Sequence, residues 1–356
     1  MRRTALTFVG IPALAFVLAF GAASCAPAAK HRGPEAYTYS AVTAADGIAI
    51  DSSGYIWVLG EAGDLGELSP NGALMGQMPL DSCTGSGGSS LTGYYGIAID
   101  AYGNVWAVNY ACDFVDELTP SNNSLSHFDT GVAPYGIAID YAGNAWVGDN
   151  GSHSLTPPYY SDVTEIGTNT ITKYPASSTT SFNSNCAESV AIDQYNVVWL
   201  SGCGYVYMID GSTGTPLNGQ YDFVKTNNPS PGSIAIDPNN DAWVTDVDSI
   251  YLLNPSNAPV LMYSASGANL KGIAIDRVGD VWVTDDSTGT VLKLNPNGIL
   301  LAAYAVGNGP GGVAIDAYGN VWVANTTDGT VTKWVGIAAG PQYWPYGGPQ
   351  FPAGQP

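Results

Sequence analysis

A twelve-residue segment recurs seven times in this chain of 356 residues. The copy at residues 312–323 reads Gly-Val-Ala-Ile-Asp-Ala-Tyr-Gly-Asn-Val-Trp-Val. Successive copies start 39 to 53 residues apart, at Gly47, Gly96, Gly136, Ser189, Ser233, Gly272 and Gly312. A period near forty residues with several short strands is typical of one four-stranded blade of a β-propeller. The repeat therefore predicts an all-β fold, a seven-bladed β-propeller of four-stranded antiparallel blades.

Each copy predicts a β-hairpin, because two apolar runs flank a four-residue polar connection. The first position of the connection is Asp, whose carboxylate can accept hydrogen bonds from N–H groups of the turn. The fourth position is always Gly or Asn, the residue types that tolerate a positive φ best. We therefore interpret the aspartates as structural, with calcium binding as the alternative. They are Asp51, Asp100, Asp140, Asp193, Asp237, Asp276 and Asp316.

One tryptophan stands at a fixed position in every copy, which accounts for seven of the nine in the chain. This regular spacing favours a core role, in which each ring forms a wedge between neighbouring sheets. The alternative is a cage of aromatic side chains around a ligand. The seven residues are Trp57, Trp106, Trp146, Trp199, Trp243, Trp282 and Trp322.

Two further strands follow the hairpin in every copy but the last, as in residues 290–294 and 299–304, which flank an Asn-Pro-Asn-Gly turn. The last copy lacks a fourth strand, because residues 330–334 lead directly into a segment rich in Pro and Gly. Residues 36–41 precede the first copy, where the fourth strand of a preceding blade would stand. We therefore expect the N-terminal strand to complete the last blade and close a propeller that spans residues 36–336, leaving no free sheet edge.

The first 24 residues have the pattern of a bacterial secretory signal peptide: two arginines, an apolar run from 5 to 20, and small residues. Cys25 follows directly, so it is expected to be the lipid-modified first residue of a lipoprotein, with residues 25–35 as its tether. The alternative is ordinary cleavage a few residues later, for instance after Ala28. The sequence thus predicts an extracytoplasmic protein of the cell envelope, in the periplasm or on the cell surface.

Five cysteines in an exported chain leave one unpaired, which supports lipid modification of Cys25. The other four fall into two equivalent pairs. In each pair, one cysteine precedes the first strand of a blade and the other follows its second strand, so the two lie on one face of the propeller. We therefore expect two disulfides, Cys83–Cys112 and Cys186–Cys203, with a structural zinc site as the rival interpretation.

The chain carries 30 acidic and ten basic residues. Cleavage of the signal peptide removes Arg2 and Arg3 and leaves a net charge near −22. Such a surface repels nucleic acid and anionic membranes, so neither is expected as a partner apart from the lipid anchor. We expect a monomer that binds a protein, peptide or glycan, and we interpret residues 337–356 as a flexible Pro/Gly-rich tail.

A candidate metal site lies three residues after the tryptophans, where five of the seven blades carry Asp or Asn. These side chains offer oxygen ligands suited to Ca²⁺ or Mg²⁺ at the mouth of the central channel. The alternative is that each one caps its own loop through local hydrogen bonds. His153, in a loop at this mouth, is the one candidate catalytic base. The candidate metal ligands are Asn109, Asp149, Asp246, Asp285 and Asn325.

At the repeated hairpin, over about residues 36–336, the chain resembles the NHL-repeat and streptogramin-lyase-like β-propellers. Streptogramin lyases are seven-bladed and open a macrocyclic lactone with a His/Glu cluster and Mg²⁺ at one channel mouth. This sequence shows no counterpart of that cluster apart from His153. NHL propellers mostly bind proteins or other ligands, so the resemblance implies the fold more strongly than an activity.

These observations favour a non-enzymatic binding module of the cell envelope. Its ligand is expected on the disulfide-braced face, where the long loops at residues 81–95 and 176–188 are rich in Ser, Gly, Thr and Tyr. The alternative is a metal-dependent lyase or lactonase with its site at the channel mouth.

Overall fold

The repeated hairpin forms the two innermost strands of each sheet in the computed structural model. The described residues are 34–84, 90–91, 93–150, 162–175, 187–202, 205–217, 221–222, 232–254 and 259–341. No helix in this described part is long and apolar enough to cross a lipid bilayer.

The described strands form seven antiparallel blades, each starting with an innermost strand. The innermost strands are β2 (Ala45–Ile50), β8 (Tyr94–Ile99), β12 (Pro134–Ile139), β16 (Ser189–Ile192), β21 (Ile234–Ile236), β25 (Leu270–Ile275) and β29 (Pro310–Ile315). The second strands, which carry the tryptophans, are β3 (Ile56–Gly60), β9 (Val105–Asn109), β13 (Ala145–Asp149), β17 (Val197–Gly202), β22 (Ala242–Asp246), β26 (Val281–Asp285) and β30 (Val321–Asn325).

Two outer strands complete each blade. The third strands are β4 (Asp64–Leu68), β10 (Phe114–Thr119), β14 (Asp162–Ile166), β18 (Tyr205–Asp210), β23 (Ser249–Leu253), β27 (Thr290–Leu294) and β31 (Thr330–Trp334). The fourth strands are β5 (Leu74–Pro79), β11 (Ser124–Asp129), β15 (Ile171–Pro175), β19 (Thr215–Pro216), β24 (Val260–Ser264), β28 (Leu300–Ala305) and β1 (Ala36–Ser40). Short strands β6 (Cys83–Thr84) and β7 (Ser90–Leu91) pair in a loop, and β20 (Tyr221–Asp222) extends the fourth blade.

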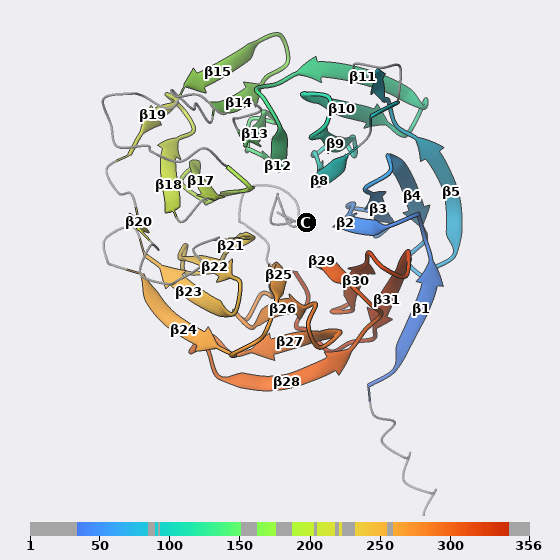
Figure 1. The fold of residues 1–356 in the computed structure, drawn as a ribbon, viewed down its shortest axis with the longest axis vertical. Helices are drawn as coiled ribbons and strands as arrows, with labels where there is room; N and C mark the ends of the chain where they lie inside the picture. Colours follow the sequence, from blue (N-terminus) through green and yellow to red (C-terminus); the bar gives the residue numbers. More distant parts are fainter. Residues whose placement is uncertain are drawn as a thin grey trace, which may run out of the picture. The chain divides into compact units, whose positions relative to one another are not determined.

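The blades form a closed ring, which confirms the seven-bladed propeller. The innermost strands contact one another in the order β2, β8, β12, β16, β21, β25, β29 and back to β2, and Figure 1 shows the sheets arranged around a common centre. In the last blade, β1 pairs with β31 from the other end of the sequence, with Tyr39 opposite Val331. The N-terminal strand therefore completes the final blade, as the sequence predicts.

The turn of every hairpin has the predicted conformation and hydrogen bonds. Asp140 illustrates the pattern: its Oδ1 accepts hydrogen bonds from the backbone N–H groups of Ala142 and Asn144. The fourth position of the turn has a positive φ in all seven blades, including 61° at Asn196 and 71° at Asn240. The aspartates thus have the structural role that their position in the motif indicates.

Each tryptophan lies between neighbouring blades, as predicted. None of the seven is more than 5% exposed. Trp57 of the first blade packs with Tyr94 and Ile97 of the second, and Trp322 of the last blade packs with Ala45 and Ile48 of the first. The repeated rings therefore form the core between sheets.

The glycine at the start of the repeat is required where innermost strands approach each other closely. A Cβ on Gly96 would lie 2.4 Å from the backbone oxygen of Tyr135 in the next blade, and one on Gly136 would lie 2.8 Å from the backbone oxygen of Glu188. A side chain at these positions would push adjacent blades apart. Glycine at these two positions therefore permits the close approach of adjacent blades.

The chain immediately after β31 is attached to the turns of the last two blades. Ala338 N–H donates to the oxygen of Gly319, and Ala339 N–H donates to Oδ2 of Asp276. Asp276 also forms an isolated β-bridge with Pro341. Residues 337–341, which the sequence places in the tail, are therefore bonded to the propeller; residues 342–356 lie outside the described part.

Candidate functional site

One face of the propeller carries the loops that precede the first strands and follow the second strands. The Cys83–Cys112 disulfide lies on this face, as predicted, and joins the segment before β8 to the segment after β9 with a Cα–Cα distance of 5.7 Å. Cys25, His153, Cys186 and Cys203 lie outside the described residues. The described disulfide connects two loops of one blade at the predicted binding face.

The five predicted metal ligands all lie at the ends of second strands and are buried. Their exposed fractions do not exceed 4%. Asn109 accepts a hydrogen bond from Ala111 N–H and donates to the backbone oxygen of Asp81. Asn325 accepts from Gly307 N–H and donates to Thr330 and Thr332.

The aspartates of this set make similar local bonds. Asp149 Oδ2 accepts from the Thr164 hydroxyl, and Asp246 Oδ1 accepts from Val247 N–H. Asp285 accepts from the backbone of Asn269 and from both the backbone and the hydroxyl of Ser287. Burial alone would raise the pKa of Asp285, but these hydrogen bonds outweigh it and lower the pKa.

These contacts support the interpretation of the five residues as loop caps, since each side chain bonds to its own blade or to the segment that leads into it. None of the five lines the central cavity described next. Binding of Ca²⁺ or Mg²⁺ by this set stays a prediction.

A cavity of about 280 Å³ lies at the ring centre on the same face. All seven blades contribute to its lining. The residue just before the first position of each repeat copy lines it in every blade: Asp46, Tyr95, Tyr135, Glu188, Gly232, Lys271 and Gly311. Glu61, which follows β3, adds a third carboxylate. The described lining residues thus include three carboxylates, two tyrosines and one lysine.

Stacked aromatic rings form one wall of the cavity. The rings of Tyr95 and Tyr135 lie 4.5 Å apart between centroids, with only 11° between their planes. Tyr110 packs edge-on against both, at 5.6 and 6.0 Å. Tyrosine rings have a polarisable π-system that can attract cations and planar groups.

The carboxylates of the cavity are only partly exposed to water. Burial raises the pKa of Asp46 to about 6, and the negative charge of Glu61 adds to the increase. Hydrogen bonding from Thr326 and the charge of Lys271 oppose the shift. Burial likewise raises the pKa of Glu188. A cation bound in this cavity would therefore be attracted by incompletely hydrated negative charge.

The lining residues were missed because they lie outside the repeated motif. Their position, one residue before the repeat, holds Asp, Tyr, Tyr, Glu, Gly, Lys and Gly in chain order. The residue type varies at this fixed position beside an otherwise constant motif, and that variation is the sequence signal by which the lining residues could have been identified. Their meeting at one point depends on the closure of the ring.

No protein-family model and no curated protein matches the sequence. Solved structures are similar in fold. Virginiamycin B lyase from Staphylococcus aureus superposes with a TM-score of 0.70 at 16% identity, covering 85% of this chain and 99% of the lyase. Kuenenia stuttgartiensis hydrazine synthase has a TM-score of 0.68 at 14% identity, covering 84% of this chain and 97% of that one.

A third similar structure is described as the extracellular domain of a hybrid two-component system of B. thetaiotaomicron. Its TM-score is 0.64 at 12% identity, covering 86% of this chain and 42% of that chain. A lyase, a synthase and an extracellular domain thus share this architecture, so the likeness shows the fold and no single chemistry. The chain described here has the seven-bladed β-propeller fold of the streptogramin B lyases.

Proposed function

We propose that this protein is an exported binding module of the cell envelope, whose central cavity binds the positively charged group of a peptide, protein or small organic ligand. The observation that carries the proposal is the cavity lining, where Asp46, Glu61 and Glu188 outnumber Lys271 beside a stacked tyrosine wall. A volume of about 280 Å³ suits one side chain or a small molecule. An arginine or lysine side chain fits both the charge and the aromatic wall.

Calorimetric titration with short peptides tests this proposal. A tripeptide with central arginine should bind, whereas the same peptide with citrulline, a neutral isostere, should bind at least tenfold more weakly. Replacing Glu188 by Gln should reduce arginine-peptide affinity at least tenfold, because it removes one partner of a desolvated charge pair. Asp129→Asn, an exposed carboxylate on β11, is the matched control. Equal affinity for the two peptides would contradict the proposal.

Export and lipid anchoring are part of the same proposal. The signal-like residues 1–24 and the cysteine that follows them support it, and the Cys83–Cys112 disulfide is typical of an oxidising compartment. Metabolic labelling with a radioactive fatty acid checks the anchor: the wild-type protein should incorporate label and Cys25→Ser should not. Labelling of both proteins, or of neither, would exclude Cys25 as the anchor.

A second candidate function is ring opening of a cyclic lactone, favoured by likeness to the lyases over 85% of this chain. Another structure of the staphylococcal lyase contains quinupristin. Incubation of this protein with quinupristin, followed by chromatography, tests that function. Unchanged quinupristin after prolonged incubation with Mg²⁺ would exclude activity on that compound.

Asp246 and Asp285 bond to their own loops. The hypothesis that they bind Ca²⁺ or Mg²⁺ is tested separately. Thermal unfolding with EDTA, Ca²⁺ or Mg²⁺ should show a metal-dependent shift of at least a degree or two if a site exists. That shift should vanish in Asp246→Ala or Asp285→Ala. An identical unfolding curve in all three conditions would leave these residues as loop caps.

A further inference from the structure

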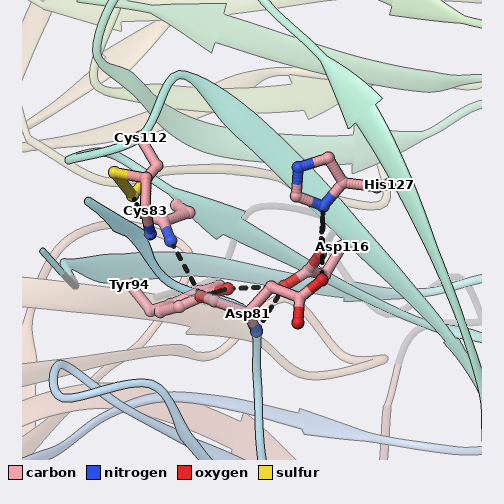
Figure 2. A network of polar contacts seen from close by, with 7 residues as sticks. Asp81, Cys83, Tyr94, Cys112, Asp116 and His127 are labelled. Atoms are coloured by element: carbon pink, nitrogen blue, oxygen red, sulfur yellow. Dashed lines mark hydrogen bonds and ion pairs between the residues drawn. A yellow bond between two sulfur atoms is a disulfide. The ribbon is translucent and has the colours of Figure 1, made fainter. Parts of the chain in front are cut away.

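A second cluster of polar side chains lies in the second blade, outside the central cavity. Asp116 on β10 faces His127 on β11 as a cross-strand pair, with His127 Nδ1 2.9 Å from Asp116 Oδ1. Asp81, in the segment between β5 and β8, places its Oδ2 3.7 Å from the same nitrogen. Figure 2 shows the three side chains together beside the Cys83–Cys112 disulfide. None of the three lines the central cavity.

The buried member of this cluster is held firmly. Asp116 is 0% exposed. Its second oxygen, Oδ2, lies 2.5 Å from the hydroxyl of buried Tyr94 and accepts a hydrogen bond from Asp81 N–H. The Tyr94 hydroxyl also bonds to the backbone oxygen of Asp81 at 2.7 Å. These contacts orient the Asp116 carboxylate so that Oδ1 points toward His127 (Figure 2).

The two outer members are accessible to solvent. The side chains of His127 and Asp81 are 43% and 59% exposed. The ring of His127 packs against Phe114, with centroids 3.8 Å apart. No Lys or Arg in the described part of the chain forms an ion pair with either carboxylate. The cluster therefore has two carboxylates, one of them fully buried, facing a single imidazole.

This arrangement has the chemistry of a transition-metal site. One ligand atom from each of Asp81, Asp116 and His127 lies within 4.8 Å of the other two. Tetrahedral zinc with bonds near 2 Å separates its ligand atoms by about 3.3 Å. The separations of His127 Nδ1 from the two carboxylates, 2.9 and 3.7 Å, bracket that value, and the two carboxylate oxygens lie within 4.8 Å of each other, so the exposed Asp81 and His127 side chains need only adjust locally to hold one ion. Imidazole nitrogen favours zinc-like ions over Ca²⁺ and Mg²⁺, which prefer oxygen ligands.

We propose that Asp81, Asp116 and His127 bind a divalent transition-metal ion of the zinc class, with water completing the coordination. The ion takes the place of the hydrogen between His127 Nδ1 and Asp116 Oδ1, that proton passes to Nε2 or to water, and the charge of the ion neutralises the two carboxylates. It also connects the segment that crosses from the first blade to the second with the outer strands β10 and β11. The site reinforces the loop that the disulfide already constrains.

Metal titration of the purified protein tests this site. The protein is first dialysed against a chelator and then against metal-free buffer, without reductant, so that the disulfide persists and contributes no thiolates. Calorimetry with Zn²⁺ should show a site of one ion per chain with a dissociation constant below 100 µM, an order-of-magnitude threshold set by its three ligands. Co²⁺ bound at the same site should give visible absorption bands of a low-symmetry complex.

Variants of the two exposed ligands separate this site from other histidines in the chain. His127→Gln and Asp81→Asn should each lower Zn²⁺ affinity at least tenfold and weaken the Co²⁺ bands, while their unfolding temperatures in chelator stay close to wild type. Asp129→Asn removes a carboxylate two residues along β11 and should leave both readouts unchanged. Wild-type affinity weaker than 100 µM, or full retention of binding in His127→Gln, would overturn the proposal.

Discussion

Asp316 accepts a hydrogen bond at 2.9 Å from the indole nitrogen of Trp322, six residues later in the same hairpin. The same Asp–Trp pair occurs in all seven blades, with distances between 2.9 and 3.4 Å. The second carboxylate oxygen of each aspartate binds the turn backbone, as in the bonds from Tyr318 and Asn320 to Asp316. One side chain thus joins the turn to the tryptophan between the blades.

Replacing Asp316 by Ala should therefore destabilise the fold markedly. The change removes the acceptor for two backbone N–H groups, the Asn320 amide and the Trp322 indole, and these donors are buried or partly buried. We expect a loss of about 2–4 kcal/mol in the free energy of unfolding, measured by urea denaturation. Tyr318→Ala, at an 80% exposed position in the same turn, should change it by less than about 0.5 kcal/mol. Similar losses in the two variants would contradict this role of Asp316.

Two turn glycines should differ in their tolerance of alanine. Gly103 and Gly319 both have positive φ, 82° and 75°. A Cβ on Gly103 meets nothing within 4 Å, whereas one on Gly319 would lie 2.2 Å from the oxygen of Ala338. Gly103→Ala should lower the free energy of unfolding by about 1–2 kcal/mol through backbone strain alone. Gly319→Ala should lower it distinctly more, because its Cβ also clashes.

Truncation of the chain after Val335 provides the control for this comparison. It removes Ala338, so Gly103→Ala and Gly319→Ala should then lower the free energy of unfolding by equal amounts. Thermal unfolding of the two variants, with and without the truncation, measures this. If the difference between Gly103→Ala and Gly319→Ala persisted in the truncated protein, the attached segment would not be its cause.

Loss of the described disulfide should lower the free energy of unfolding by about 3–4 kcal/mol. This is the chain-entropy contribution expected for a loop closed by Cys83 and Cys112, which are 29 residues apart. The double substitution Cys83→Ala, Cys112→Ala tests this by urea denaturation under oxidising conditions. Adding reductant to this variant isolates the predicted Cys186–Cys203 bridge, because no other predicted pair remains. A double variant as stable as the wild type would show that the bridge does not constrain the unfolded chain.

Stability should also depend on pH through Asp46. Its pKa is raised from 3.8 to about 6 in the folded protein, by burial first and then by Glu61. Between these values the folded protein holds a proton that the unfolded chain has released, so stability falls as the pH rises from about 4 to about 6. Asp46→Asn removes this ionisation, and the new side chain still presents an acceptor to Thr326.

We therefore expect Asp46→Asn to be more stable than the wild type by about 1–3 kcal/mol at pH 8 and equally stable at pH 4. Urea denaturation at the two pH values measures the difference, with Asp129→Asn as an exposed control that should gain nothing. A gain that is the same at both pH values would exclude ionisation of Asp46 as its cause.

The sequence by itself determined the repeated elements of this protein. Asp at the start of each turn, Gly or Asn at its end and Trp in the second strand act within about six residues of one another. The hairpin they form is consequently visible in any single copy. The count of copies predicted the blade number, and the missing strand after residues 330–334 predicted the closure by β1. The equivalent places of Cys83 and Cys112 in one blade predicted their disulfide.

The tertiary structure alone decided where the candidate sites lie. The cavity joins Asp46, Tyr135 and Glu188, which are separated by dozens of residues and meet only when the ring closes. Asp116 and His127 are paired by strand register, and Asp81 reaches them from the crossover between blades. The second-strand residue Asp285 bonds to its own loop because N–H donors stand within reach there. Local hydrogen-bond chemistry is encoded in adjacent residues, whereas convergence of side chains depends on long-range packing that no single repeat contains.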